Sequence, residues 1–195
     1  MIIKEERKVE QAVKEIRMGE IRSSENEEEM ILEGYAVVFN SVTDLGWCKE
    51  IIDKNAFNGC NMQDCVLKYN HNDSCLILAR TRNKSLELTV DDKGLKIRAK
   101  LIDTTNNKDI YKMVKEGLLD KMSFAFTVAE RKWDYETDTR TVLRIARLFD
   151  VSVVDFPAYD ETELSARSKK SYEKEKQEYL QFKLDKEKLK LKLSL

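Results

Sequence analysis

The sequence predicts an α+β protein built on a closed or strongly bent, mainly antiparallel β-barrel with a few flanking helices. One observation behind this is alternation: apolar and polar residues take turns through Leu86–Val90 and Leu95–Leu101, on either side of the turn-forming stretch Asp91–Gly94. Such a pattern is a strong hairpin signal. The other is that strand-like segments dominate the middle of the chain, although only one proline and six glycines interrupt its 195 residues. The predicted order of elements along the chain therefore contains many strands and few helices.

The first predicted strand pair lies near the N-terminus. Residues Ile31–Phe39 are rich in β-branched and aromatic side chains, which favour strands. We expect them to pair with residues Val13–Ile21 across the acidic turn Asn26–Glu29. Gly34 interrupts the run, and we interpret it as the mark of a β-bulge.

A helix and a short strand are predicted next to the residues of chemical interest. Between Thr105 and Glu116, apolar residues recur at helical spacing, and Gly117 follows as a C-cap. This helix leads the chain to Ser123. Earlier in the chain, Cys65–Tyr69 predicts a short strand that ends just before His71.

Two long strands complete the predicted sheet. Residues Met122–Trp133 and Thr141–Phe156 have strand character and are joined across Glu136–Thr139. Pro157 ends the second strand, because proline cannot donate to a strand ladder.

The composition changes after Ala158, which divides the chain into a domain of residues 1–158 and a charged tail of residues 159–195. Residues 168–195 contain nine lysines and five acidic residues, with aromatic residues and leucines between them. One interpretation is an amphipathic helix that docks on a partner or is removed, although Lys188–Leu193 alternates with a period of two. The other is a solvated end of the chain.

Charge and hydropathy exclude several functional classes. The 35 basic and 36 acidic residues nearly cancel, so nothing in the net charge of −1 indicates nucleic-acid binding. The apolar runs are too short to predict a membrane span. The N-terminus becomes charged too early for a signal peptide, so we expect an intracellular protein.

The cysteines predict neither a metal site nor disulfides. Cys48, Cys60, Cys65 and Cys75 form no Cys-x-x-Cys pair, and one histidine cannot complete the usual zinc patterns. We therefore expect four reduced thiols and no metal or other cofactor. A cysteine hydrolase that uses Cys65 or Cys75 beside the histidine stays open as a minor alternative.

The candidate chemistry centres on His71, the only histidine of the chain. Imidazole is the side chain best suited to proton transfer near neutral pH, and a serine hydroxyl becomes a good nucleophile only when such a base removes its proton. Ser123 and His71 fit these roles, and Asp150 is the candidate carboxylate that would orient the imidazole. On an extended strand, Asp150 would share a face with Leu148, Ser152 and Val154. A purely structural role for the histidine is the competing interpretation.

A series of motifs gives these three residues a context. In chain order they are Glu33–Asn40, Asn55–Phe57, Asn70–Asn72, Ala79–Thr81, Asp92–Leu95, Gly117–Leu119, Met122–Phe126 and Asp150–Ala158. In their order and spacing they resemble the prohead maturation serine proteases of tailed bacteriophages, whose fold is similar to that of herpesvirus capsid-assembly proteases. The resemblance covers about Gly34 to Ala158. The chain departs from the family pattern at Asn55 and Ala125, where glycine is usual, and at Asp150, where glutamate is frequent.

The resemblance implies His71 as general base, Ser123 as nucleophile and Asp150 as the residue that orients the histidine. It also implies an endopeptidase that works inside the immature phage capsid, in the host cell cytoplasm. Segments of scaffold and of the major capsid protein, and the protease itself, would be cleaved. Neither nucleic acid nor a membrane is an expected partner, and a homo-oligomer stays open.

Two further questions stay open at this point. A non-enzymatic capsid assembly or scaffold-binding module would explain the same motifs without catalysis. The sequence also does not locate an oxyanion hole, the set of donors that stabilises the tetrahedral intermediate. Arg144 and Arg147 precede Asp150 and would either assist or be solvated, and solvation is the usual state of arginine.

Overall fold

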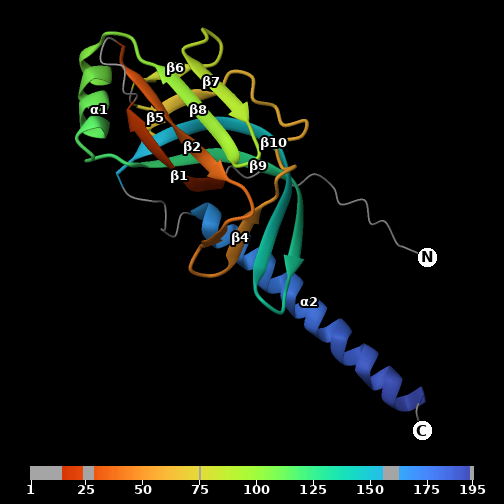
Figure 1. Ribbon diagram of the computed structural model, residues 1–195. Helices are drawn as coiled ribbons and strands as arrows, with labels where there is room; N and C mark the ends of the chain where they lie inside the picture. The colour runs from red at the N-terminus through yellow and green to blue at the C-terminus, as the bar shows by residue number, and fades with distance from the viewer. Residues whose placement is uncertain (1–14, 24–28, 75, 156–162, 194–195) are drawn as a thin grey trace.

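The computed structural model describes residues 15–23, 29–74, 76–155 and 163–193, which form one ten-stranded mixed sheet with two helices (Figure 1). The elements, in chain order, are β1 (Glu15–Ser23), β2 (Ile31–Val38), β3 (Val42–Asp44), β4 (Lys49–Ile52), β5 (Val66–Tyr69), β6 (Ala79–Arg80), β7 (Leu86–Val90), β8 (Gly94–Lys100), α1 (Thr105–Lys115), β9 (Lys121–Asp134), β10 (Thr139–Val154) and α2 (Glu163–Leu193).

The sheet is open, so the expected closed barrel is wrong. Its strands follow the order β3-β4-β10-β9-β1-β2-β8-β7, with β5 attached to β10 and β6 attached to β5. A barrel requires the strands at the two ends of this path to pair with each other. Within the described residues, β3 pairs with β4 alone and β7 with β8 alone. The outer side of β10 is divided between β4 and β5, both parallel to it, so the sheet branches there.

The predicted hairpin, helix and pair of long strands are confirmed. The β7–β8 hairpin has Val90 opposite Leu95 at its closed end. Helix α1 begins after Thr104, whose hydroxyl accepts a hydrogen bond from the Asn107 N–H at 3.2 Å. Beyond its last turn, Gly117 has a φ of 73°, the left-handed conformation that glycine adopts without strain. The long strands β9 and β10 lie within two residues of their predicted bounds.

Strands β1 and β2 pair as predicted, but Gly34 has another role than the one expected. The register shift of β2 falls between Tyr35 and Val37, after Gly34. A Cβ on Gly34 would lie 2.0 Å from the Glu20 carbonyl oxygen. Glycine is therefore required because the two backbones approach closely. Residues 13–14 and most of the predicted turn lie outside the described residues.

Strand β9 has two faces of opposite character, and this positions the site. Met122, Phe124 and Phe126 point into the hydrophobic core, where the two phenyl rings stack with centroids 4.8 Å apart. Ser123 and Ala125 alternate with them and therefore lie on the other face. The core thus fixes β9, and the polar site is carried on its reverse side.

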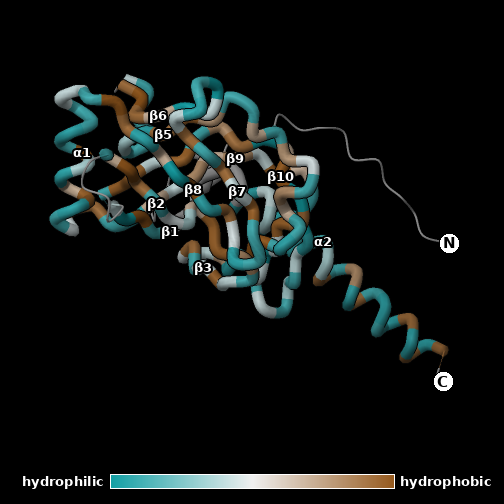
Figure 2. The backbone as a smooth tube through the Cα atoms, turned by 45° about the horizontal axis from the view of Figure 1, so that its top comes forward, coloured by the Kyte–Doolittle hydropathy of each residue, from teal (hydrophilic) through white to brown (hydrophobic). Residues whose placement is uncertain are grey.

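Helix α2 docks on the β9–β10 hairpin through side chains between Tyr172 and Lys183, and its last turns extend away from the sheet (Figure 1). The Tyr172 ring packs 4.4 Å from that of Trp133. Farther along, hydrophobic and hydrophilic residues alternate on the exposed helix (Figure 2), which includes the period-two stretch 188–193. The expected domain boundary at residue 158 lies outside the described residues. Among those described, no helix has the length and apolar character to cross a membrane.

Candidate active site

Ser123 sits in the middle of the sheet, on β9. Its cross-strand partner on β10 is Ser152, and its partner on β1 is Met18. Paired residues point to the same face, with Cβ atoms about 4.5–5.5 Å apart. Ser123 and Ser152 are both 0% exposed. The predicted nucleophile therefore lies in a dry position between two other strands.

Asp150 reaches the Ser123 face because β10 contains a bulge. Leu148 pairs with Phe126 in the core, but Asp150 pairs with Ala125, which shifts the register by one residue at Phe149. Without this shift Asp150 would oppose Phe124 and point into the core, since a slip of one residue moves a side chain to the other face. The prediction that Leu148 shares a face with Asp150 is therefore wrong. Asp150 does share its face with Ser152.

His71 arrives from the third strand of the site, β5. This strand runs parallel to β10, with Val66 beside Asp150 and Tyr69 beside Val153. The chain then turns, and the Asn72 N–H donates to the Tyr69 carbonyl at 3.1 Å. The turn places the imidazole over β10, where Nδ1 contacts Oδ1 of Asp150. Two residues 79 positions apart thus form a charge-assisted pair.

Ser152 belongs to the same cluster, although the sequence singled it out only as a neighbour of Asp150. Its Oγ lies 3.1 Å from Asp150 Oδ1 and 3.2 Å from His71 Nδ1. It also accepts a hydrogen bond from the His71 backbone N–H at 3.2 Å. Period-two alternation from Asp150 is the signal that indicates this residue.

Two atoms of the candidate triad make no hydrogen bond within the part of the chain that the structure describes. His71 Nε2 and Ser123 Oγ are both buried, and neither has a hydrogen-bond partner among the described residues. His71 and Asp150 are in contact, whereas Ser123 shares their face without a hydrogen bond to the histidine. Because Ser123 is fully buried, a substrate carbonyl reaches it only after a neighbouring segment moves.

The thiols of Cys60 and Cys65 are poor nucleophiles. Burial raises the pKa of Cys65 to about 12, and the nearby Asp150 charge adds to this effect. Burial also raises the pKa of Cys60 to about 11. Thiolate, the reactive form, is therefore scarce at neutral pH. Cys75 lies outside the described residues.

The two arginines that precede Asp150 have other contacts. Arg144 is more than half exposed and lies 3.8 Å from Glu130. Arg147 stacks over the Phe149 ring, with 4.9 Å between its guanidinium carbon and the ring centroid. Each interaction is typical of a surface arginine.

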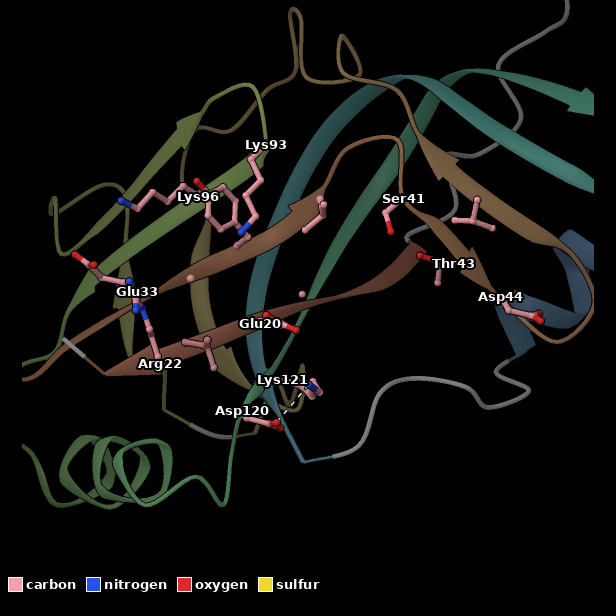
Figure 3. A pocket seen from close by; sticks show the side chains of 16 residues that line it. Glu20, Arg22, Glu33, Ser41, Thr43, Asp44, Lys93, Lys96, Asp120 and Lys121 are labelled. Carbon is pink, nitrogen blue, oxygen red and sulfur yellow. Dashed lines mark ion pairs between the residues drawn. The ribbon is translucent and has the colours of Figure 1, made fainter. Parts of the chain in front are cut away.

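A groove opens beside the site on the outer face of β1 and β2. Its volume is about 1030 Å³, and it carries charges of both signs (Figure 3). Its charged lining residues are Glu20, Arg22, Glu33, Asp44, Lys93, Lys96, Asp120 and Lys121. Glu20 and Lys121 are cross-strand partners, and Ser123 lies two residues beyond Lys121 on the same face of β9. The groove thus begins two residues from the candidate nucleophile along β9.

Comparison with known proteins agrees with this architecture. The chain is 27% identical over 151 residues to the prohead protease of Enterobacteria phage HK97. The aligned residues make up 75% of this chain and 64% of the length of that protein. Its fold is similar to that of the capsid assembly protease of bacteriophage T4, with a TM-score of 0.52 over 74% of this chain and 99% of the T4 chain, at 12% identity.

A family model describes most of the chain. The model for the caudovirus prohead serine protease matches residues 17–178, a range that contains the whole cluster around His71, Ser123 and Asp150. The match also includes the first half of α2, to residue 178, and therefore Tyr172 and Lys176, which contact the β9–β10 hairpin. The chain belongs to the caudovirus prohead serine protease family.

Proposed function

We propose that this protein is a serine endopeptidase that cleaves scaffold or capsid-protein segments, and itself, while a phage head matures. It would act inside the immature capsid, in the host cell. The observation that carries this proposal is the state of His71. Its Nδ1 contacts Asp150, whereas neither Nε2 nor the Ser123 hydroxyl on the same face has a hydrogen-bond partner among the residues that the structure describes. Family membership and the name of the HK97 relative support the same reaction.

The chemistry follows from these three groups. As Ser123 Oγ bonds to the substrate carbonyl carbon, its proton moves to His71 Nε2. The imidazolium then gives that proton to the leaving nitrogen, and the peptide bond breaks to form an acyl-enzyme. Water, deprotonated by the same Nε2, hydrolyses the ester and restores Ser123. Asp150 keeps Nδ1 protonated throughout and stabilises the positive charge on the ring.

The groove and the tail supply binding surfaces in this proposal. An extended substrate segment would lie in the groove next to Lys121, two residues from Ser123 along β9. The exposed part of α2 beyond its docked turns, which is rich in lysine and leucine, would dock on an acidic or helical scaffold or be removed by self-cleavage.

Mass spectrometry of the full chain tests the proposed self-cleavage. Wild-type protein and the Ser123→Ala variant are incubated at high concentration, and their masses are followed over time. We expect truncation in the wild type and an intact variant. Truncation at the same rate in both proteins would show that this serine does not perform the cleavage.

The second candidate is a non-enzymatic assembly or scaffold-binding module, and the full burial of Ser123 favours it. A binding protein would have no need for substrate access to this residue. Alanine at His71, Ser123 and Asp150 together would then leave capsid maturation unchanged. A block of maturation by the folded triple variant would eliminate this candidate.

A further inference from the structure

We propose that Ser152 is a positioning residue, which holds His71 and Asp150 in the arrangement that directs the imidazole to Ser123. The inference rests on the proposed peptidase function, but it concerns a residue to which the three-residue mechanism gives no role. It starts from the backbone at His71.

The turn that presents His71 is strained. Asn70 and His71 both have a φ of 52°, in the left-handed region. Asparagine and histidine enter this region more readily than most residues, but consecutive left-handed residues still need external support. The support comes from β10: the Asn70 N–H donates to the Val153 carbonyl at 2.9 Å, and the Asn70 side-chain oxygen accepts from the Asp155 N–H at 3.2 Å.

Ser152 is the support of His71 itself. The His71 backbone N–H donates to Ser152 Oγ. The hydroxyl carries one proton, and an ionised carboxylate can only accept, so this proton goes to Asp150 Oδ1. Asp150 Oδ1 also receives the Nδ1–H of the imidazole. The chain of bonds runs from the His71 backbone through Ser152 and Asp150 back to the His71 ring.

This closed ring of hydrogen bonds fixes both the position and the tautomer of the imidazole, and the proposed catalysis needs both. It sets the height of the imidazole above β10, because backbone and ring are both attached to the same strand. It also sets the tautomer, because the bond at one ring nitrogen decides which nitrogen carries the proton. With Nδ1 protonated, Nε2 is left as the acceptor for the Ser123 proton. The position of Ser152, opposite Ser123 in the sheet, keeps all four groups on one face.

The test compares Ser152→Ala with Ser152→Thr, which retains the hydroxyl. Ser85→Ala is the matched control: Ser85 also accepts from a backbone N–H, that of Arg80 at 2.9 Å, and donates to a side-chain oxygen, that of Asn83 at 2.6 Å, before β7. Thermal unfolding by circular dichroism establishes that each variant is folded. Because the chain has one histidine, ¹⁵N-histidine labelling gives the ring and amide signals of His71 without overlap.

In Ser152→Ala we expect the His71 amide to lose its protection from hydrogen exchange and the ring nitrogens to report a mixture of tautomers. We expect kcat to fall about tenfold or more and KM to stay within about twofold of the wild-type value. A fall of this size corresponds to the loss of one hydrogen bond to a charged group. Ser152→Thr should recover most of each effect, and Ser85→Ala should show none. Unchanged amide protection, tautomer and kcat in folded Ser152→Ala would overturn the inference.

Two other outcomes separate this inference from the proposed function. If wild-type protein has no peptidase activity but the amide and ring signals respond as expected, the positioning role holds and the peptidase proposal fails. If a fluorophosphonate labels Ser152 in place of Ser123, Ser152 is itself the nucleophile and the positioning role is refuted.

Discussion

Asp150 stands opposite Ala125 across β10 and β9, on the face of the sheet that carries Ser123. The pairing exists because the register shift at Phe149 turns Asp150 away from the core. It also places a small side chain beside the carboxylate that contacts His71. The bulge and the alanine together make room for the buried contact between Asp150 and His71, and this leads to the first prediction.

Ala125→Leu should damage the site more than the fold. Ala125 is 0% exposed, so a larger side chain overpacks its position, at a cost of about 1–3 kcal/mol in the free energy of unfolding. It also displaces the carboxylate of Asp150, and we expect kcat to fall at least about tenfold. Urea unfolding and peptidase kinetics measure the two effects. Ala125→Gly is the control and should retain activity. An Ala125→Leu enzyme with wild-type kcat would contradict the claim that the small side chain of Ala125 leaves room for the Asp150 carboxylate.

Asp150→Asn should abolish most activity while preserving the shape of the side chain. The amide can no longer stabilise the imidazolium and can bind the wrong tautomer, so we expect kcat to fall about a hundredfold or more. Steady-state kinetics on a peptide substrate measures it. Asp73→Asn is the control, because Asp73 lies on the loop that carries His71 and its side chain is 86% exposed. Equal activities in the two variants would exclude Asp150 from the mechanism.

Thiol alkylation at neutral pH should leave peptidase activity intact. The pKa values of Cys60 and Cys65 are raised by burial to about 11 and about 12, so both thiols are protonated at pH 7. The reaction with iodoacetamide, followed by mass spectrometry, should therefore be slow at these two residues. Loss of activity in step with the modification of a single cysteine would instead support the cysteine hydrolase.

The docking of α2 should weaken in acid. A hydrogen bond from Lys176, and then one from Tyr172, lowers the pKa of Asp138, and the Lys183 side chain lowers the pKa of Glu136. Carboxyl groups with a lowered pKa stabilise the docked state above their ordinary pKa, and this contribution is lost as the pH falls through the lowered values. We therefore expect release below about pH 4, where unperturbed carboxyl groups protonate.

Tryptophan fluorescence reports this release. Both tryptophans, Trp47 and Trp133, contact Tyr172, with ring centroids 5.6 and 4.4 Å away. Their emission should shift to the red in acid. Asp138→Asn should move the transition to higher pH, whereas Asp185→Asn, on the exposed part of the helix, should not. An emission spectrum that is constant from pH 7 to pH 3 would refute the electrostatic contribution to docking.

Local patterns predicted the longer elements, but they predicted neither the short strands β3, β4 and β6 nor the long-range pairing of strands. The β7–β8 hairpin and α1 follow from alternation, turn residues and capping, which all lie within a few positions of each other. The parallel pairing of β5 with β10 joins segments about 80 residues apart, and no local pattern specifies it. The barrel prediction failed because closure depends on whether the strands at the two ends of the sheet pair, which no local pattern specifies either.

The residues of the site could be predicted, whereas their geometry could not. His71, Ser123 and Asp150 stood out because imidazole, hydroxyl and carboxylate are the groups that the chemistry needs. The bulge at Phe149 does not show in an alternating pattern, since Leu148, Asp150 and Ser152 fit one face equally well on paper. The register shifts between these residues because Leu148 has to pack in the core, whereas Asp150 has to face the polar site.

Co-expression with the phage's own capsid protein tests the central claim most directly, because Ser123 is buried in the isolated chain and assembly provides the natural setting for access. Capsid-protein mass is measured with wild-type protease and with the Ser123→Ala, His71→Gln and Asp150→Asn variants. We expect a shortened capsid protein with the wild type alone and full-length protein with Ser123→Ala. Shortening by Ser123→Ala at the wild-type rate would contradict the role of this serine.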